Sequence, residues 1–168
     1  MGYDLHVSDP ETRTVIALQG DAAMLTRTAL PEPMPPWPDR PNSRTRRGQV
    51  SLLRIAPARW LVLAPLVQED TLQAALGRAN GATVTVLSDS LAFFALSGAD
   101  ADAAMAIACP LDLDARVFGH DSASFTDAFG TRALVQREGP GWTLAVECSY
   151  AAYVGAYLRR IGRASSPD

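Results

Sequence analysis

Six of the twelve prolines in the chain lie close together, between Pro31 and Pro41. Proline lacks a backbone N–H, and its ring clashes with the preceding turn of a helix, so this stretch can be neither a helix interior nor a central strand. Turn-forming residues follow as far as Gly48. The sequence therefore predicts a long Pro/Arg-rich loop over residues 31–48, and regular elements must begin again beyond it.

Regular elements are predicted on both sides of this loop. Apolar and β-branched runs predict strands at residues 14–18, 49–55, 60–64 and 83–87. A helix through about Ala29 is expected after the turn Gly20-Asp21. A second helix is expected over residues 69–79, where apolar residues recur at helical spacing: Leu72, Ala75, Leu76 and Ala79. The order β-α-β-β-α-β is that of a split ferredoxin-like unit.

The rest of the chain gives a similar series. Strands are predicted at residues 91–96, 122–129, 132–137 and 142–147. Ser97 to Asp100 resembles a capping box before an alanine-rich helix that ends near Cys109-Pro110, and residues 111–121 are predicted to be loop. Ser149 is expected to cap the last helix and Gly162 to end it, with residues 163–168 frayed. Its apolar positions give the strongest helical pattern in the chain: Tyr150, Tyr153, Val154, Tyr157, Leu158 and Ile161.

A weak internal repeat relates the two series. Residues 16–21 (IALQGD) recur as 94–99 (FALSGA), and residues 60–63 (WLVL) recur as 142–145 (WTLA). Alternating strands and helices also recur by chance, so a duplication is one of two interpretations. If the repeat is real, the fold class is α+β, with two related ferredoxin-like β-α-β-β-α halves, about 14–88 and 91–161, packed as a single domain over 1–168.

Composition excludes several classes of function. The chain has 168 residues and a formal net charge of -3, which argues against a general nucleic-acid or membrane-surface role. All fifteen basic residues are arginine, which removes Schiff-base chemistry and any lysine-dependent phosphate loop. Neither an apolar run of roughly 18 residues nor a signal peptide is recognisable, so a cytoplasmic location is expected.

A search for catalytic or metal-binding motifs finds no convincing candidate. The sequence has no glycine-rich nucleotide loop and no nucleophile elbow. Neither of its two histidines stands near Cys109 or Cys148 at metal-ligand spacing, so no metal site is predicted and both cysteines are interpreted as buried thiols. His120 and Asp121 could serve Ser122 or Ser124, but adjacent residues of an extended segment point apart. We therefore expect no catalytic residue.

Three further features each allow a functional and a structural interpretation. Asp112 and Asp114 could tune each other's pKa, although an exposed acidic loop is the simpler interpretation. Cys109 is interpreted as a small apolar residue at a helix end, because no cation nearby would lower its pKa. Trp60 and Trp142 could be stacking platforms, but their place in strands favours core anchors.

Several segments, in this order and spacing, carry a family resemblance: 58–65 (ARWLVLAP), 85–90 (TVLSDS), 96–100 (LSGAD), 108–113 (ACPLDL), Val117-Phe118, Phe125-Thr126 and 149–153 (SYAAY). Together they resemble the gamma subunit of heterotetrameric sarcosine oxidase. The resemblance covers roughly residues 49–161, and Cys109-Pro110-Leu111-Asp112-Leu113 is its most distinctive part. It implies a fold similar to the folate-binding domains of glycine-cleavage aminomethyltransferases.

The resemblance also implies a function. The chain would be a structural subunit of a flavoenzyme that oxidatively demethylates sarcosine or a related N-methyl amine, assembled with alpha, beta and delta subunits and above all with the large alpha subunit. The implied complex uses FAD, FMN, NAD and tetrahydrofolate, none of them expected in this chain alone. The alternatives are a free-standing folate-binding or one-carbon transfer protein and a small scaffold outside any oxidase.

A noncatalytic subunit acts through its contacts, and two segments of the sequence are candidate interfaces. Assembly interfaces favour arginine and aromatic side chains. One candidate is the loop 31–48 with Arg40, Arg44, Arg46 and Arg47, although a solvated loop is its simpler interpretation. The other is the segment 109–118, which contributes Cys109, Asp112 and Phe118.

Overall fold

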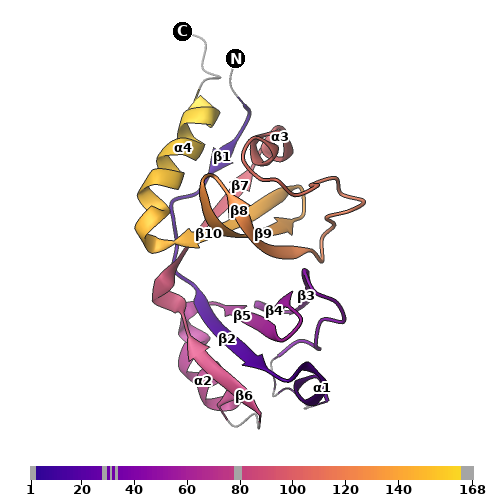
Figure 1. Ribbon diagram of the computed structural model, residues 1–168. Coiled ribbons are helices and arrows are strands. Elements are labelled where there is room, and N and C mark those ends of the chain that lie inside the picture. Colours follow the sequence, from indigo (N-terminus) through magenta and orange to yellow (C-terminus); the bar gives the residue numbers. More distant parts are fainter. Residues whose placement is uncertain (1–2, 28–29, 31, 33, 78–80, 164–168) are drawn as a thin grey trace. The chain divides into compact units, whose positions relative to one another are not determined.

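The structure is a computed structural model that describes residues 3–27, 30, 32, 34–77 and 81–163. The chain divides into two compact units (Figure 1). The N-unit is Thr12–Asp89, and the C-unit is Ser90–Asp168 together with Met1–Glu11. Each unit has its own antiparallel sheet of five strands and its own hydrophobic core.

The N-unit is built on a sheet with the strand order β3-β4-β5-β2-β6. Its elements are β2 (Thr14–Gly20), α1 (Ala22–Leu25), β3 (Ser43–Arg47), β4 (Val50–Ala56), β5 (Arg59–Ala64), the 3-10 turn η1 (Leu66–Gln68), α2 (Glu69–Leu76) and β6 (Ala82–Val86). As predicted, Asp21 begins α1, since its carboxylate accepts the N–H of Ala23 at 2.7 Å. Leu72 and Leu76 of α2 are buried against the sheet, as the helical spacing indicates.

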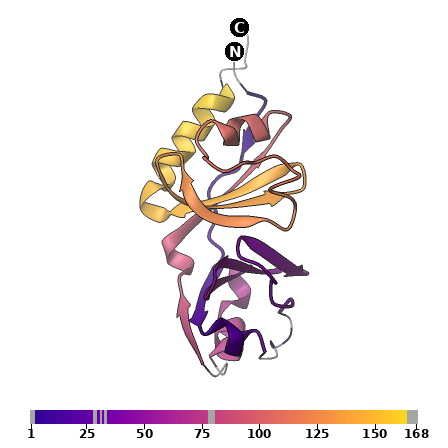
Figure 2. The ribbon, with the colours of Figure 1, turned by 45° about the vertical axis from the view of Figure 1, so that its right-hand side comes forward.

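The C-unit repeats this plan. Its elements are β1 (His6–Val7), the 3-10 turn η2 (Ser88–Ser90) at its boundary with the N-unit, β7 (Leu91–Ser97), α3 (Ala101–Ala106), β8 (Ala123–Ala128), β9 (Thr131–Glu138), β10 (Gly141–Glu147), the 3-10 turn η3 (Cys148–Tyr150) and α4 (Ala151–Arg163). The strand order is β8-β9-β10-β7-β1. α4 lies beside β1 and β10 (Figure 2), with Val154 and Leu158 fully buried and Tyr153 more than half exposed.

The repeated sequence segments occupy matching places in the two sheets. Leu18 of β2 lies opposite Trp60 of β5, and its counterpart in the repeat, Leu96 of β7, lies opposite Trp142 of β10. Both tryptophans are buried, at 0% and 1% exposure, so the prediction that they are core anchors is confirmed. One strand breaks the parallel: β1, from the N-terminus, takes the sheet position in the C-unit that β6 takes in the N-unit.

Two strands were missed by the sequence analysis. The loop prediction for residues 31–48 is wrong for β3, which forms after the last proline of the cluster and pairs with β4. β3 is the edge strand of its sheet, so the nearby prolines remove no hydrogen bond from a central ladder. β1 has two residues, too few for any alternation of apolar and polar residues to be recognised.

Three predicted helix ends are also wrong. Ser149 does not cap the last helix, since it lies inside η3, and Gly162 does not end α4, which continues to Arg163. Asp100 makes no side-chain cap for α3, because its carboxylate accepts the N–H of Asp4, at 2.8 Å. The N-terminal segment thus takes over bonds that the sequence analysis assigned within the helix.

Two helices end earlier than predicted, α1 at Leu25 and α2 at Leu76. The predicted ends themselves, Ala29 and Ala79, lie outside the described residues, as does the segment 164–168. The packing of the two halves as one domain stays a prediction. Among the helices of the described residues, none combines the length and the apolar character that a membrane crossing requires.

Gly162 generates the first testable prediction. Glycine inside a helix usually costs roughly 0.5 to 1 kcal/mol relative to alanine. Here a Cβ on residue 162 would lie 2.8 Å from the backbone oxygen of Leu5. Gly162→Ala is therefore expected to lower the free energy of unfolding, by roughly 1 to 3 kcal/mol, because the N-terminal segment must move away. Urea unfolding monitored by circular dichroism measures it, and a more stable variant would contradict the close approach of Leu5 to α4.

Candidate functional site

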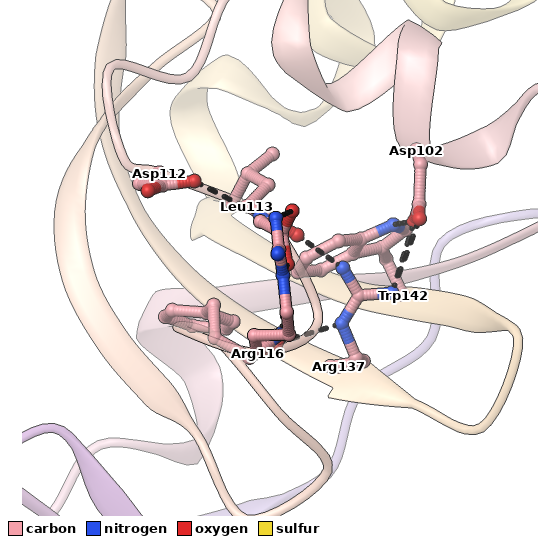
Figure 3. Close-up of polar contacts among 8 residues, drawn as sticks. Asp102, Asp112, Leu113, Arg116, Arg137 and Trp142 are labelled. Atoms are coloured by element: carbon pink, nitrogen blue, oxygen red, sulfur yellow. Dashed lines mark hydrogen bonds and ion pairs between the residues drawn. The ribbon is translucent and has the colours of Figure 1, made fainter.

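A buried arginine organises the polar part of the C-unit. Arg137 of β9 is 4% exposed, and its guanidinium lies against an irregular segment that contains Leu113 (Figure 3). Its Nε donates to the backbone oxygen of Phe118 at 2.8 Å, and its Nη2 donates to the backbone oxygen of Leu113. The segment 109–118, called here the latched loop, is therefore held by side-chain bonds to its main chain.

A carboxylate completes the arginine's bonds. Asp102 of α3 accepts from Arg137 Nη1 at 3.1 and 3.3 Å, and its Oδ1 also accepts the indole N–H of Trp142 at 2.8 Å. The guanidinium carbon lies 4.2 Å from the centre of the Trp142 ring, a cation–π distance. Phe118 packs on the same ring, with the two centres 5.7 Å apart. Each nitrogen of the guanidinium thus has an acceptor, and its charge is balanced inside the cluster.

The N-unit carries a counterpart without the carboxylate. Arg54 lies opposite Trp60 in the sheet, as Arg137 lies opposite Trp142, and its guanidinium carbon is 5.5 Å from the ring centre of Trp60. Its Nη1 and Nη2 donate to the backbone oxygens of Asp39 and Pro57, at 3.0 and 2.9 Å. Arg54 Nε and Trp60 Nε1, however, are buried without a hydrogen-bond partner. Arg54 therefore donates fewer hydrogen bonds than Arg137, and none of those described goes to a carboxylate.

The outer side of the latched loop is a tight acidic turn. The backbone oxygen of Asp114 accepts the N–H groups of Val117 and Phe118, both at 2.8 Å. Asp112 Oδ1 accepts the N–H of Asp114 at 3.1 Å, and the Asp114 carboxylate pairs with Arg116 at 2.7 Å. Hydrogen bonds from Arg116 lower the pKa of Asp114 to about 2. The partner of the Asp114 carboxylate in this turn is therefore a cation.

The interface candidates in this loop differ in exposure. Asp112 is exposed, whereas Cys109 and Phe118 are 6% and 7% exposed and belong to the C-unit core. Burial raises the pKa of the Cys109 thiol, which therefore stays protonated at neutral pH, as its apolar interpretation predicts. Cys109 and Phe118 therefore support the loop from the core side. The prediction of two buried thiols is confirmed for Cys109 and wrong for Cys148, which is exposed.

The four candidate arginines lie at or near β3. Arg44 is buried, at 7% exposure, whereas Arg40, Arg46 and Arg47 are exposed. Arg46 Nε donates to the backbone oxygen of Gly48 at 3.1 Å, and Arg47 pairs with Glu32 at 2.6 Å. Charged side chains on an edge strand hinder pairing with the strand of another molecule, so these arginines have a structural role whether or not they bind a partner.

The residues considered as catalytic candidates differ in exposure. His120 and Asp121 are exposed, whereas Ser122 and Ser124 are buried at 7% and 6% exposure. Within the described residues, no group of three His, Cys, Asp or Glu side chains is arranged to hold a metal ion. What the structure does bring together is the Arg137 cluster, which binds the protein's own loop.

Arg137 was not among the predicted site residues, although its spacing from Trp142 indicates a contact between the two side chains. In both hairpins an arginine stands five or six residues before a tryptophan, Arg54 before Trp60 and Arg137 before Trp142. With the intervening turn, this spacing places the two side chains opposite each other in antiparallel strands. The partners Asp102, Leu113 and Phe118 are distant in sequence and could not be recognised in this way.

The fold resembles two solved structures. One is a chain of the heterotetrameric sarcosine oxidase from Corynebacterium sp. U-96 in complex with pyrrole 2-carboxylate, at 20% identity and a TM-score of 0.76, covering 97% of this chain and 88% of that chain. The other is the glycine cleavage system aminomethyltransferase T from Bartonella henselae, at 17% identity and a TM-score of 0.64, covering 94% of this chain and 46% of that one. No family model and no curated protein matches the sequence. The predicted fold class, α+β and similar to aminomethyltransferases, is confirmed.

The Asp102 carboxylate generates a matched pair of predictions. Trp142→Phe and Trp60→Phe remove the same atoms from equivalent buried sites, but only Trp142 donates a hydrogen bond from its indole nitrogen. Trp142→Phe is therefore expected to lower the free energy of unfolding by about 1 to 2 kcal/mol more than Trp60→Phe. Chemical denaturation of both variants measures the difference, and equal losses would show that the bond to Asp102 adds no stability.

The pair of Asp114 and Arg116 generates a prediction about pH. The pKa of Asp114 is about 2 in the folded chain, against an ordinary value of 3.8. This pair therefore stabilises the fold fully above the ordinary value, and the contribution is lost as the pH falls through about 2. In Arg116→Gln, carboxyl NMR titration should show the pKa of Asp114 rising towards its ordinary value. The control Arg159→Gln, on α4, should leave it unchanged; an equal rise in both variants would refute the local pairing.

Proposed function

We propose that this chain is a gamma-type, noncatalytic subunit of a heterotetrameric flavoenzyme of the sarcosine oxidase kind, acting in the cytoplasm in the oxidative demethylation of sarcosine or a related N-methyl amine. The observation that carries the proposal is the mutual coverage of the two folds. The alignment spans 97% of this chain and 88% of the oxidase chain, so the two are nearly co-extensive.

The contacts of the C-unit support a role in assembly. The Arg137 cluster uses its arginine, carboxylate and indole to bind one another and a loop, so the bonds described for it are internal to the protein. In this proposal FAD, FMN, NAD and tetrahydrofolate belong to the other subunits. The alpha, beta and delta subunits are the partners, and the large alpha subunit is the main contact.

A second candidate function is a free-standing folate-binding or one-carbon transfer protein. It is favoured by the similarity to aminomethyltransferase T, which extends over 94% of this chain. The chain spans less than half of that protein, however, so a site built from the whole aminomethyltransferase could not be complete here. Binding of tetrahydrofolate by the isolated chain, measured by calorimetry, would favour this second function.

Expression alone and in combination tests the proposal. The chain purified alone should show no flavin absorbance and no sarcosine-dependent production of hydrogen peroxide. Co-expressed with the oxidase subunits encoded beside its gene, it should purify as a complex that has both. If the subunits assemble into an active oxidase without this chain and never retain it, the proposed function is wrong.

A further inference from the structure

We propose that the latched loop, residues 109–118, is the surface through which this chain docks on its large partner subunit, and that the partner presents a basic surface with an apolar recess for Val117. This inference rests on the proposed function and adds the contact surface and the chemistry of its partner. It follows from three properties of the loop: how firmly it is held, what it exposes and what charge it carries.

The loop is ordered before any partner arrives. Arg137 holds the backbone at Leu113 and Phe118, two positions that bracket the exposed turn. Phe118 and Leu113 are themselves buried, at 7% and 8% exposure. A segment fixed in this way loses little conformational entropy on binding, which favours affinity. A buried arginine that places its donors on the main chain of a surface loop thus makes that loop a rigid contact element.

Val117 is the apolar residue that this rigid turn presents to solvent. It is 64% exposed, while its neighbour Phe118 points into the core. The backbone N–H of Val117 is bonded to Asp114, so the valine cannot turn inward without breaking the turn. Pro110 and Ala115 of the same loop are also exposed. This arrangement fits an apolar interface centre with a polar rim.

The rim is acidic, which specifies the partner. The side chain of Asp102 is 59% exposed, that of Asp114 is 40% exposed, and Asp112 is exposed. Two of these carboxylates are paired with cations: Asp114 with Arg116, whose side chain is 89% exposed, and Asp102 with the buried Arg137. Three carboxylates and two guanidinium groups give these five side chains a net charge of -1, and Asp112 carries the excess negative charge. Complementary potential requires a partner surface rich in arginine or lysine.

The comparison with the N-unit favours this loop over residues 31–48. The counterpart Arg54 holds its loop without a carboxylate, and its Nε has no partner. The strand that follows, β3, is basic, with Arg46 and Arg47 exposed on a sheet edge. Of the two equivalent arginines, Arg137 has an acceptor for every guanidinium nitrogen and Arg54 does not. The fully bonded arginine is the one that supports the turn with Asp114 and Val117.

The test compares two exposed valines in the co-expressed oxidase complex. Val117→Arg places a bulky cation against the proposed basic surface, whereas Val67→Arg makes the same exchange at a 90% exposed position of η1 in the N-unit. Neither change should alter the melting temperature. Val117→Arg is expected to weaken binding of the chain to the complex lacking it by at least about tenfold, and Val67→Arg to leave it unchanged. Equal affinities for Val117→Arg and the wild type, or equal losses in both variants, would overturn the inference.

A charge variant tests the partner's chemistry. Asp112→Asn keeps the oxygen that accepts the N–H of Asp114 and removes one negative charge. The association rate with the complex should fall about threefold at low salt, and its dependence on salt should become shallower. An unchanged or faster association would overturn the basic partner surface. If the wild-type chain itself fails to join the complex, the proposed function fails as well, and that result is distinct from a complex that forms equally well with every variant.

Discussion

The C-unit depends on the placement of one buried cation, the guanidinium of Arg137. A charge removed from water is tolerated only when it is paired and its donors are bonded. Asp102 supplies the charge, the backbone oxygens of Leu113 and Phe118 supply the remaining acceptors, and the ring of Trp142 covers one face. These contacts join α3, the β9–β10 hairpin and the irregular segment between α3 and β8. The hydrogen bonds from Arg137 to the backbone oxygens of Leu113 and Phe118 therefore hold the latched loop in its conformation.

The two units show how one plan accommodates different surfaces. Both sheets have the same strand order, both place a leucine and an arginine opposite a buried tryptophan, and both use that arginine to bond the backbone of a loop. They differ at the carboxylate and at the fifth strand, which the N-terminus supplies in the C-unit as β1. The internal repeat seen in the sequence thus corresponds to matching sheet positions, and the differences lie in the loops. This is where related units usually acquire separate functions.

The Arg137 cluster and the latched loop differ in what their side chains contact. The polar groups of the Arg137 cluster are bonded to one another, and the latched loop exposes Val117, two carboxylates and the guanidinium of Arg116, which is paired with Asp114. Such a distribution suits a protein that binds another protein, because the rigid core of the cluster lowers the cost of presenting the loop. The sequence analysis considered the residues of this loop as interface candidates but assigned Cys109 and Phe118 to the contact itself. The structure gives those two a supporting position beneath it.

The sequence by itself determined the central strands, the strong amphipathic pattern of α4 and the buried tryptophans, because alternation, helical spacing and aromatic bulk are local properties of the chain. It also determined that the proline cluster could form no central strand. Only the tertiary structure decided that β1 completes the C-unit sheet, that Asp100 bonds Asp4 in place of capping α3, and that Gly162 continues α4 beside Leu5. Each of these outcomes joins residues more than eighty positions apart. The Arg137 cluster belongs to the same class, because the acceptors that a buried guanidinium finds are set by which distant backbone the fold brings within reach.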